Sequence, residues 1–131
     1  MRISRMGATV LTVLLTSAVS HAEMMERSRA GHFLVTARSH LDPLVTNRMH
    51  SWTLHVEDAA GQIVEDASIE VVGGMPAHDH GLPTAPRVTA YLGGGDYLLE
   101  GMRFHMNGGW RIELTLRTDD FTDVAVFEIE L

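Results

Sequence analysis

One-by-one alternation of apolar and polar residues is the feature of this sequence that most limits its fold. The clearest example lies between Gly109 and Arg117, where every second residue is large and apolar. A period of two residues places those side chains on one face of a β-strand, whereas in a helix they would point in opposite directions. The sequence therefore predicts strands that bury one face, and it predicts no helix after residue 22.

Seven runs with this period follow one another, separated by segments rich in glycine, proline and aspartate. The predicted strands span residues 32–38, 49–57, 67–72, 87–92, 96–106, 109–117 and 123–131. Asn107-Gly108 predicts a hairpin, because both turn positions accept a positive φ. Seven short strands in about 100 residues are typical of an all-β, immunoglobulin-like Greek-key β-sandwich with antiparallel strands. Trp52 and Trp110 fit the apolar phase of their strands and are predicted to lie in the core.

The first 22 residues have the pattern of a secretory signal peptide. Two arginines precede an apolar segment of 14 residues, Met6–Val19, and Ser20-His21-Ala22 ends in a small residue that suits a signal peptidase. The alternative, a retained membrane anchor, would need ~20 apolar residues. We therefore expect cleavage after Ala22 and a periplasmic or secreted protein without a membrane span. Residues 23–31 are expected to be flexible, and residues 32–131 to form the sandwich domain.

Composition excludes several classes of function. The formal net charge is −7 at pH 7, and it becomes −9 when the two arginines of the predicted signal peptide are removed. An acidic surface repels nucleic acids and anionic lipids, so neither is expected as a partner. The absence of cysteine excludes disulfides, thiolate metal sites and cysteine nucleophiles. The sequence has no phosphate-binding glycine loop and no serine elbow, so no enzymatic activity is expected.

Two clusters of histidine and methionine lie between the predicted strands. The first is Met75-Pro76-Ala77-His78-Asp79-His80-Gly81, and the second is Phe104-His105-Met106-Asn107-Gly108. If consecutive strands run antiparallel, both clusters meet at one end of the sandwich, where His40 and His50 also fall. His32 and His55 fall at the other end. The candidate metal ligands are therefore Met75, His78, His80, Met106 and His105.

Each candidate ligand also has a purely structural interpretation. His78 and His80 fit exposed loop positions, and Asp79 fits a turn. Met106 shares a predicted strand face with Phe104, so it fits the core as well. His105 points to the other face, and we prefer Met106 as the ligand because the inward face lies under the first cluster.

Imidazole together with thioether, without thiolate, suits copper and Cu(I) in particular. Zinc is the alternative metal, because it also binds imidazole but has little use for thioether. A site of this composition suits storage or transfer of an ion better than catalysis. The competing interpretation is a non-catalytic protein-interaction module without bound metal, which contacts its partner through the histidine-bearing end or an exposed strand edge.

The two clusters, in this order, carry a resemblance to a known family. Met75-Pro76-x-His78-x-His80-Gly81 is followed by Gly95-Asp96-Tyr97 and then by Phe104-x-Met106-x-Gly108-x-Trp110. This pattern, over residues 48–131, resembles the FixH and YtkA-like group of exported bacterial proteins. The resemblance implies an immunoglobulin-like β-sandwich that faces the periplasm or the cell exterior. The positions that match the motif are Met75, His78, His80 and Met106.

The resemblance also implies a kind of partner. FixH is associated with a copper-transporting ATPase and with assembly of a haem–copper respiratory oxidase, so a partner of either kind is expected. The chain departs from FixH at its N-terminus, where FixH proteins resemble membrane-anchored proteins with a longer span. This difference favours a free periplasmic protein over one that docks directly on a membrane pump.

Overall fold

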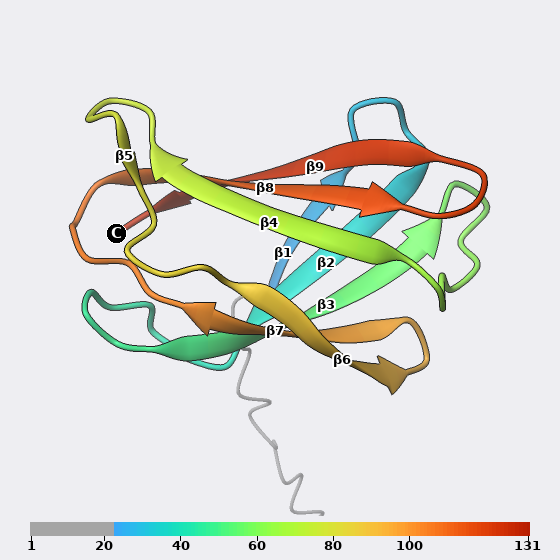
Figure 1. Cartoon of the computed structure of the whole chain (residues 1–131), viewed down its shortest axis with the longest axis horizontal. Coiled ribbons are helices and arrows are strands. Elements are labelled where there is room, and N and C mark those ends of the chain that lie inside the picture. Colours follow the sequence, from blue (N-terminus) through green and yellow to red (C-terminus); the bar gives the residue numbers. More distant parts are fainter. Residues whose placement is uncertain (1–22) are drawn as a thin grey trace, which may run out of the picture.

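The computed structural model describes residues 23–131, which form nine β-strands in two antiparallel sheets (Figure 1). The strands are β1 (Glu23–Arg27), β2 (Phe33–Ser39), β3 (His50–Asp58), β4 (Ser68–Met75), β5 (His80–Gly81), β6 (Arg87–Gly93), β7 (Asp96–Met102), β8 (Gly109–Arg117) and β9 (Thr122–Glu130). The predicted all-β sandwich is confirmed, with nine strands rather than seven. Within the described residues, no helix is long and apolar enough to cross a membrane.

The strand order is that of an immunoglobulin domain. One sheet has the order β1-β2-β3-β7-β6 and the other the order β5-β4-β8-β9. Without β1 and β5, these sets match the A-B-E-D and C-F-G sheets of a constant-type domain. The strands that carry the cysteine pair in antibody domains correspond to β3 and β8, and here they carry the fully buried Trp52 and Trp110.

The predicted alternation accounts for the core between the sheets. Every second side chain of β2, β3, β8 and β9 is buried, and the residues between them are exposed or half-buried. Each fully buried large apolar side chain stabilises the fold by about 1.5–3 kcal/mol. The largest of these side chains are Trp52, Trp110, Phe33, Phe104 and Phe127.

The segment that follows the predicted signal peptide differs from the prediction. Residues Glu23–Arg27 form strand β1, paired with β2, where the sequence predicts a flexible segment. The turn after β1 is fixed by Asp123, whose carboxylate accepts hydrogen bonds from the Ser28 hydroxyl at 2.6 Å and the Ala30 N–H at 3.1 Å. Ser28 and Asp123 are 95 positions apart, so no local pattern signals the contact. The signal peptide predicted for residues 1–22 lies outside the described residues.

The hairpin predicted at Asn107-Gly108 is wrong. β7 ends at Met102 rather than at residue 106, and the chain then crosses to the other sheet, which contains β8. Next to Gly101, with a φ of +89°, the register between β3 and β7 shifts and the regular ladder ends. Gly108, with a φ of +125°, exchanges backbone hydrogen bonds with Leu131 instead of closing a hairpin.

The connections between strands collect at the two ends of the sandwich, on the left and right of Figure 1. We call the left end the donor pole; it comprises residues 40–49, 76–81 and 103–108. We call the right end the acidic pole; it comprises residues 28–32, 59–67, 94–95 and 118–121. The strand directions therefore bring both histidine and methionine clusters to one pole, as predicted. Asn47 N–H donates to the Phe104 carbonyl at 2.7 Å and joins two of the donor-pole loops.

Candidate functional site

The first cluster forms a tight turn between β4 and β5. His80 on β5 lies opposite Met75 at the end of β4. Opposed residues of antiparallel strands point to the same face, so His80 is directed to the same side of the ribbon as Met75. Within the turn, His78 N–H donates to the Met75 carbonyl at 3.1 Å, and Asp79 has a φ of +52°. Aspartate tolerates this left-handed conformation better than most residues, so Asp79 serves the turn.

Two glycines permit the close packing around this turn. A Cβ atom at Gly74 would lie 2.7 Å from the His80 carbonyl oxygen. A Cβ atom at Gly108 would lie 2.9 Å from the methyl carbon of Met75, which shows that the Met75 side chain reaches the loop containing the second cluster. A larger residue at Gly74 would push β5 away from β4, and one at Gly108 would push the two clusters apart.

The thioether of Met75 is at the base of the donor pole. Met75 is only 1% exposed and belongs to the hydrophobic core. A ligand role for Met75 therefore requires the turn above it to open or shift. The sequence predicts Met75 as a ligand on the strength of its position in the motif, and that pattern contains no signal of how deeply it is buried.

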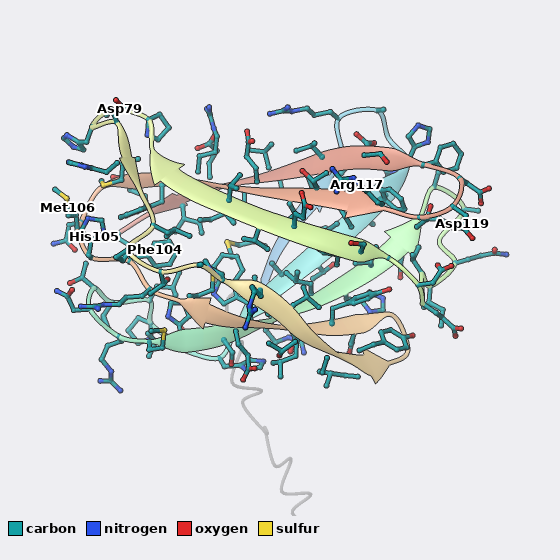
Figure 2. All side chains as sticks on the ribbon, viewed as in Figure 1. Asp79, Phe104, His105, Met106, Arg117 and Asp119 are labelled. Carbon is teal, nitrogen blue, oxygen red and sulfur yellow. The ribbon has the colours of Figure 1, made fainter. Side chains whose placement is uncertain are left out.

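Three imidazoles form a row across the donor pole. The ring centres of His78 and His80 are 6.3 Å apart, and those of His80 and His105 are also 6.3 Å apart. His105 comes from the connection between β7 and β8 and lies at the same end of the domain as Asp79 (Figure 2). The structure therefore brings His105 to the first cluster, with His80 in the middle of the row.

Met106 is exposed and His105 is half-buried, the reverse of the predicted orientation. Met106 is 36% exposed, although the sequence predicts that it lies on an inward strand face. The reason is that β7 stops at Met102, so the alternation that continues as far as Phe104 is lost at Met106. His105 is half-buried and has a buried Nδ1 atom without a hydrogen-bond partner among the described residues.

Two other histidines near this pole make local contacts, although the buried Nε2 of His50 has no hydrogen-bond partner within the described residues. The ring nitrogens of His40 lie 2.8 Å from the Ser51 hydroxyl and 2.7 Å from the Thr53 hydroxyl. The Nδ1 atom of His50 donates to the Arg48 carbonyl at 3.0 Å. Burial lowers the pKa of His50, although this backbone hydrogen bond opposes the shift. Neither histidine belongs to the row of three.

The spacing of the row is compatible with binding of one ion by neighbouring rings. A metal ion ~2 Å from a nitrogen of each of two imidazoles holds the ring centres roughly 5 to 6.5 Å apart. Within residues 23–131, however, no three histidine, aspartate or glutamate side chains are arranged to hold a metal ion as they stand. Binding by all three imidazoles would therefore require the rings to turn toward a common point.

A hollow of about 390 Å³ makes the turn between β4 and β5 accessible from the outer face of the sheet that contains β4 and β8. Asp79 and His80 form one side of it, and Arg111 and Glu113 of β8 form the other. Arg111 donates to Glu128 at 2.8 Å, and this hydrogen bond raises the pKa of the guanidinium. Both charged side chains at this wall are thus held by partners, since Glu113 accepts from Arg29 at 3.0 Å.

Trp110, on β8 beside the donor pole, has a contact that its predicted place in the core does not indicate. Trp110 is fully buried, as predicted, but its Nε1 donates to the Met106 carbonyl at 3.0 Å. Its ring also packs edge-on against His105, with the ring centres 5.4 Å apart. The only sequence signal was the spacing of four residues between Met106 and Trp110 across a turn.

Comparison with known proteins supports the resemblance. Residues 35–115, more than half of the chain, match the family model described as YtkA-like. The searches among curated proteins and solved structures found no match. The matched region runs from β2 into β8 and includes both clusters of the donor pole. The chain therefore belongs to the YtkA-like family.

Proposed function

We propose that this protein is a periplasmic copper-binding protein that buffers or delivers the ion, with the donor pole as its metal site. The observation that carries the proposal is the row of imidazoles, in which His80 lies 6.3 Å from both His78 and His105 between ring centres. These three histidines are the imidazole donors. Met75 is the thioether donor at the base of the pole, and Met106, at its surface, is the thioether alternative to His105.

The donor set favours copper over other metals. Thioether binds Cu(I) well, and imidazole binds both oxidation states of copper. Zinc is the alternative, and it would use the imidazoles alone. A mixed set of donors at the surface of a domain suits reversible binding, so we assign the protein a carrier role and no catalytic one.

The sequence also supports the compartment and the partner in this proposal. The signal-peptide pattern of residues 1–22 supports export to the periplasm. The resemblance to FixH supports a copper-transporting or oxidase-assembly protein as the partner. Since the donor pole holds both clusters, it is the end of the domain through which an ion would pass to that partner.

A competition titration tests the proposal. The protein without residues 1–22 is titrated with Cu(I) against a chromophoric chelator, beside a His78→Ala/His80→Ala variant. We expect the parent to take up one equivalent and the variant none. The matched control is His40→Ala, which removes a donor-pole imidazole whose two nitrogens are already occupied by hydroxyls. A double variant that binds as well as the parent contradicts the proposal, and so does a parent that competes for neither copper nor zinc.

A second candidate function is a protein-interaction module without metal. It is favoured by exposed apolar side chains on the two joined donor-pole loops, where Val45 is 41%, Met49 60% and Met106 36% exposed. This candidate predicts the same melting temperature with copper and with a chelator. A large rise in melting temperature with copper would exclude it, because only a ligand that binds the folded state stabilises the protein in this way.

A further inference from the structure

Trp110 contacts both donors of the second cluster in different ways. Its Nε1 donates to the carbonyl of Met106 at 3.0 Å. Its ring meets the imidazole of His105 edge-on, at 5.4 Å between centres and 69° between planes. The indole thus fixes the backbone at one residue and the side chain of the residue before it.

These two contacts decide which donor faces the first cluster. Residues 103–108 lie outside the strands, so no strand alternation orients His105 and Met106, and the contacts with Trp110 hold them instead. In the structure His105 faces His80, with the rings inclined at 74°, and Met106 is turned toward solvent. The Met106 carbonyl cannot rotate without breaking its hydrogen bond to Trp110.

We propose that Trp110 is a positioning residue that selects His105 rather than Met106 as the donor beside His80. It thereby raises the affinity of the donor pole for Cu(II) relative to Cu(I). The inference rests on the proposed copper-binding function. Its chemical basis is that an imidazole donor retains Cu(II), whereas exchange of that imidazole for a thioether favours Cu(I).

Trp52 provides a matched control on the opposite sheet. Both tryptophans are completely buried, and both rings pack against Phe104, with centre distances of 6.5 Å for Trp52 and 5.3 Å for Trp110. The Nε1 of Trp52 has no hydrogen-bond partner within the described residues. Trp52→Phe therefore removes core volume alone, whereas Trp110→Phe removes core volume together with the hydrogen bond to Met106.

The first experiment compares the affinities of the parent, Trp110→Phe and Trp52→Phe for Cu(II), and for Cu(I) under anaerobic conditions. We expect Trp110→Phe to lose roughly three- to tenfold in Cu(II) affinity, the effect of one net hydrogen bond, with a smaller change for Cu(I). Trp52→Phe is expected to keep the ratio of the two affinities. Equal losses for both oxidation states, or the same change of ratio in both variants, would overturn the inference.

A second measurement does not depend on the folding of Trp110→Phe. The chain has two tryptophans, so Trp110 is the only fluorophore of its kind in Trp52→Phe. Cu(II) bound by His105 should quench its fluorescence at short range. Stoichiometric binding of Cu(II) without quenching would show that His105 is not a ligand and would overturn the inference.

Failure of the proposed function would be recognised separately. If the parent binds no copper in either oxidation state, the copper proposal fails. The positioning role of Trp110 is then tested by NMR in the metal-free protein. A nuclear Overhauser contact between the rings of His80 and His105 is expected in the parent and should be lost in Trp110→Phe. A contact that persists in this variant contradicts positioning, whatever the result with copper.

Discussion

His55, near the acidic pole, has carboxylate partners, whereas the three histidines of the row at the donor pole have none among the described residues. His55, on β3 beside the acidic pole, has its two ring nitrogens 2.6 Å from Asp96 and 3.3 Å from Glu57. At the donor pole, no carboxylate among the described residues bonds to His78, His80 or His105. The same side chain therefore has different chemical surroundings at the two ends of one small domain.

This difference separates a histidine whose protonated form is favoured by carboxylate partners from one whose ring nitrogens can bind a metal ion. The hydrogen bond to Asp96 raises the pKa of His55, and burial only partly offsets it. A protonated imidazole has no lone pair to offer, so a histidine held in this way is a poor metal ligand. The comparison teaches that a histidine is a candidate ligand when its ring nitrogens are free, and the number of histidines in a sequence does not reveal that.

A group of carboxylates lies at the acidic pole. A hollow of about 470 Å³ at the acidic pole is lined by Asp58, Glu65, Asp66, Asp119 and Asp120, and Asp119 lies at the far end from His105 and Met106 (Figure 2). Five carboxylates thus lie at the end of the domain away from the row of imidazoles. At the donor pole, imidazole and thioether groups outnumber the carboxylates of Asp42 and Asp79, which supports the proposed preference for copper or zinc.

The largest expected effect is on metal affinity at the donor pole. His80→Ala removes the central imidazole of the row, so we expect it to weaken copper binding at least roughly hundredfold, more than either His78→Ala or His105→Ala. His55→Ala should leave copper affinity unchanged, because its imidazole is held by carboxylates at the other end. Affinities from chelator competition provide the measurement. A larger loss from His55→Ala than from His80→Ala would reverse the assigned roles of the two poles.

The fold could be predicted from the sequence because its signal is repeated. Period-two alternation marks seven of the nine strands, and burial of Trp52 and Trp110 follows from the same phase. The strands β1 and β5 were missed, since each is an edge strand held by backbone pairing and carries no alternation of its own. Pairing with β2, and the Asp123 contacts with the turn after β1, depend on distant parts of the chain.

The candidate site could be predicted only in outline. Strand direction brought both clusters to one pole, because antiparallel order fixes where each connection lies. The orientation of His105 and Met106 could not be derived, since it depends on the end of β7 at Met102 and on one hydrogen bond from Trp110. The Asn107-Gly108 dipeptide was misleading because its positive φ at Gly108 serves a crossing between sheets.

The second prediction compares one glycine from each pole. Gly108→Ala combines a φ of +125° with a contact of 2.9 Å to the methyl carbon of Met75, and we expect it to cost about 2–3 kcal/mol of stability. Gly61→Ala near the acidic pole has a φ of +79° and no atom within 4 Å, so it should cost about 1 kcal/mol. Urea unfolding of both variants measures the difference. Equal costs would mean that Met75 moves aside freely.

The third prediction concerns the anchor of the turn at the acidic pole. Burial opposes ionisation of Asp123, but hydrogen bonds from Ser28, Ala30, Val124 and His32 outweigh it and lower its pKa from 3.8 to about 2. A lowered pKa adds stability above the unfolded value of 3.8, and this stability is lost as the pH falls toward 2. Asp123→Asn should therefore cost on the order of 2 kcal/mol at neutral pH and little at ~pH 2.

Unfolding of the parent and Asp123→Asn across this acidic range provides the test. The donor-pole variant His80→Ala serves as a control and should show the same acid dependence as the parent. A difference between the parent and Asp123→Asn that stays constant down to ~pH 2 would show that the carboxylate charge does not fix the turn.

The smallest expected effect is the pH dependence contributed by His55. Its pKa is raised above 6.5, chiefly by the hydrogen bond to Asp96, so its stabilising effect is complete below 6.5 and is lost as the pH rises through the folded value. The side chain is 32% exposed, and solvent screening should keep the contribution below ~1 kcal/mol. His55→Gln should therefore destabilise the protein at ~pH 5.5 and have almost no effect at ~pH 9. Melting temperatures at both pH values, with His78→Gln as the donor-pole counterpart, measure this difference. The same pH dependence for both substitutions would show that the carboxylate partners of His55 do not distinguish it from a histidine without them.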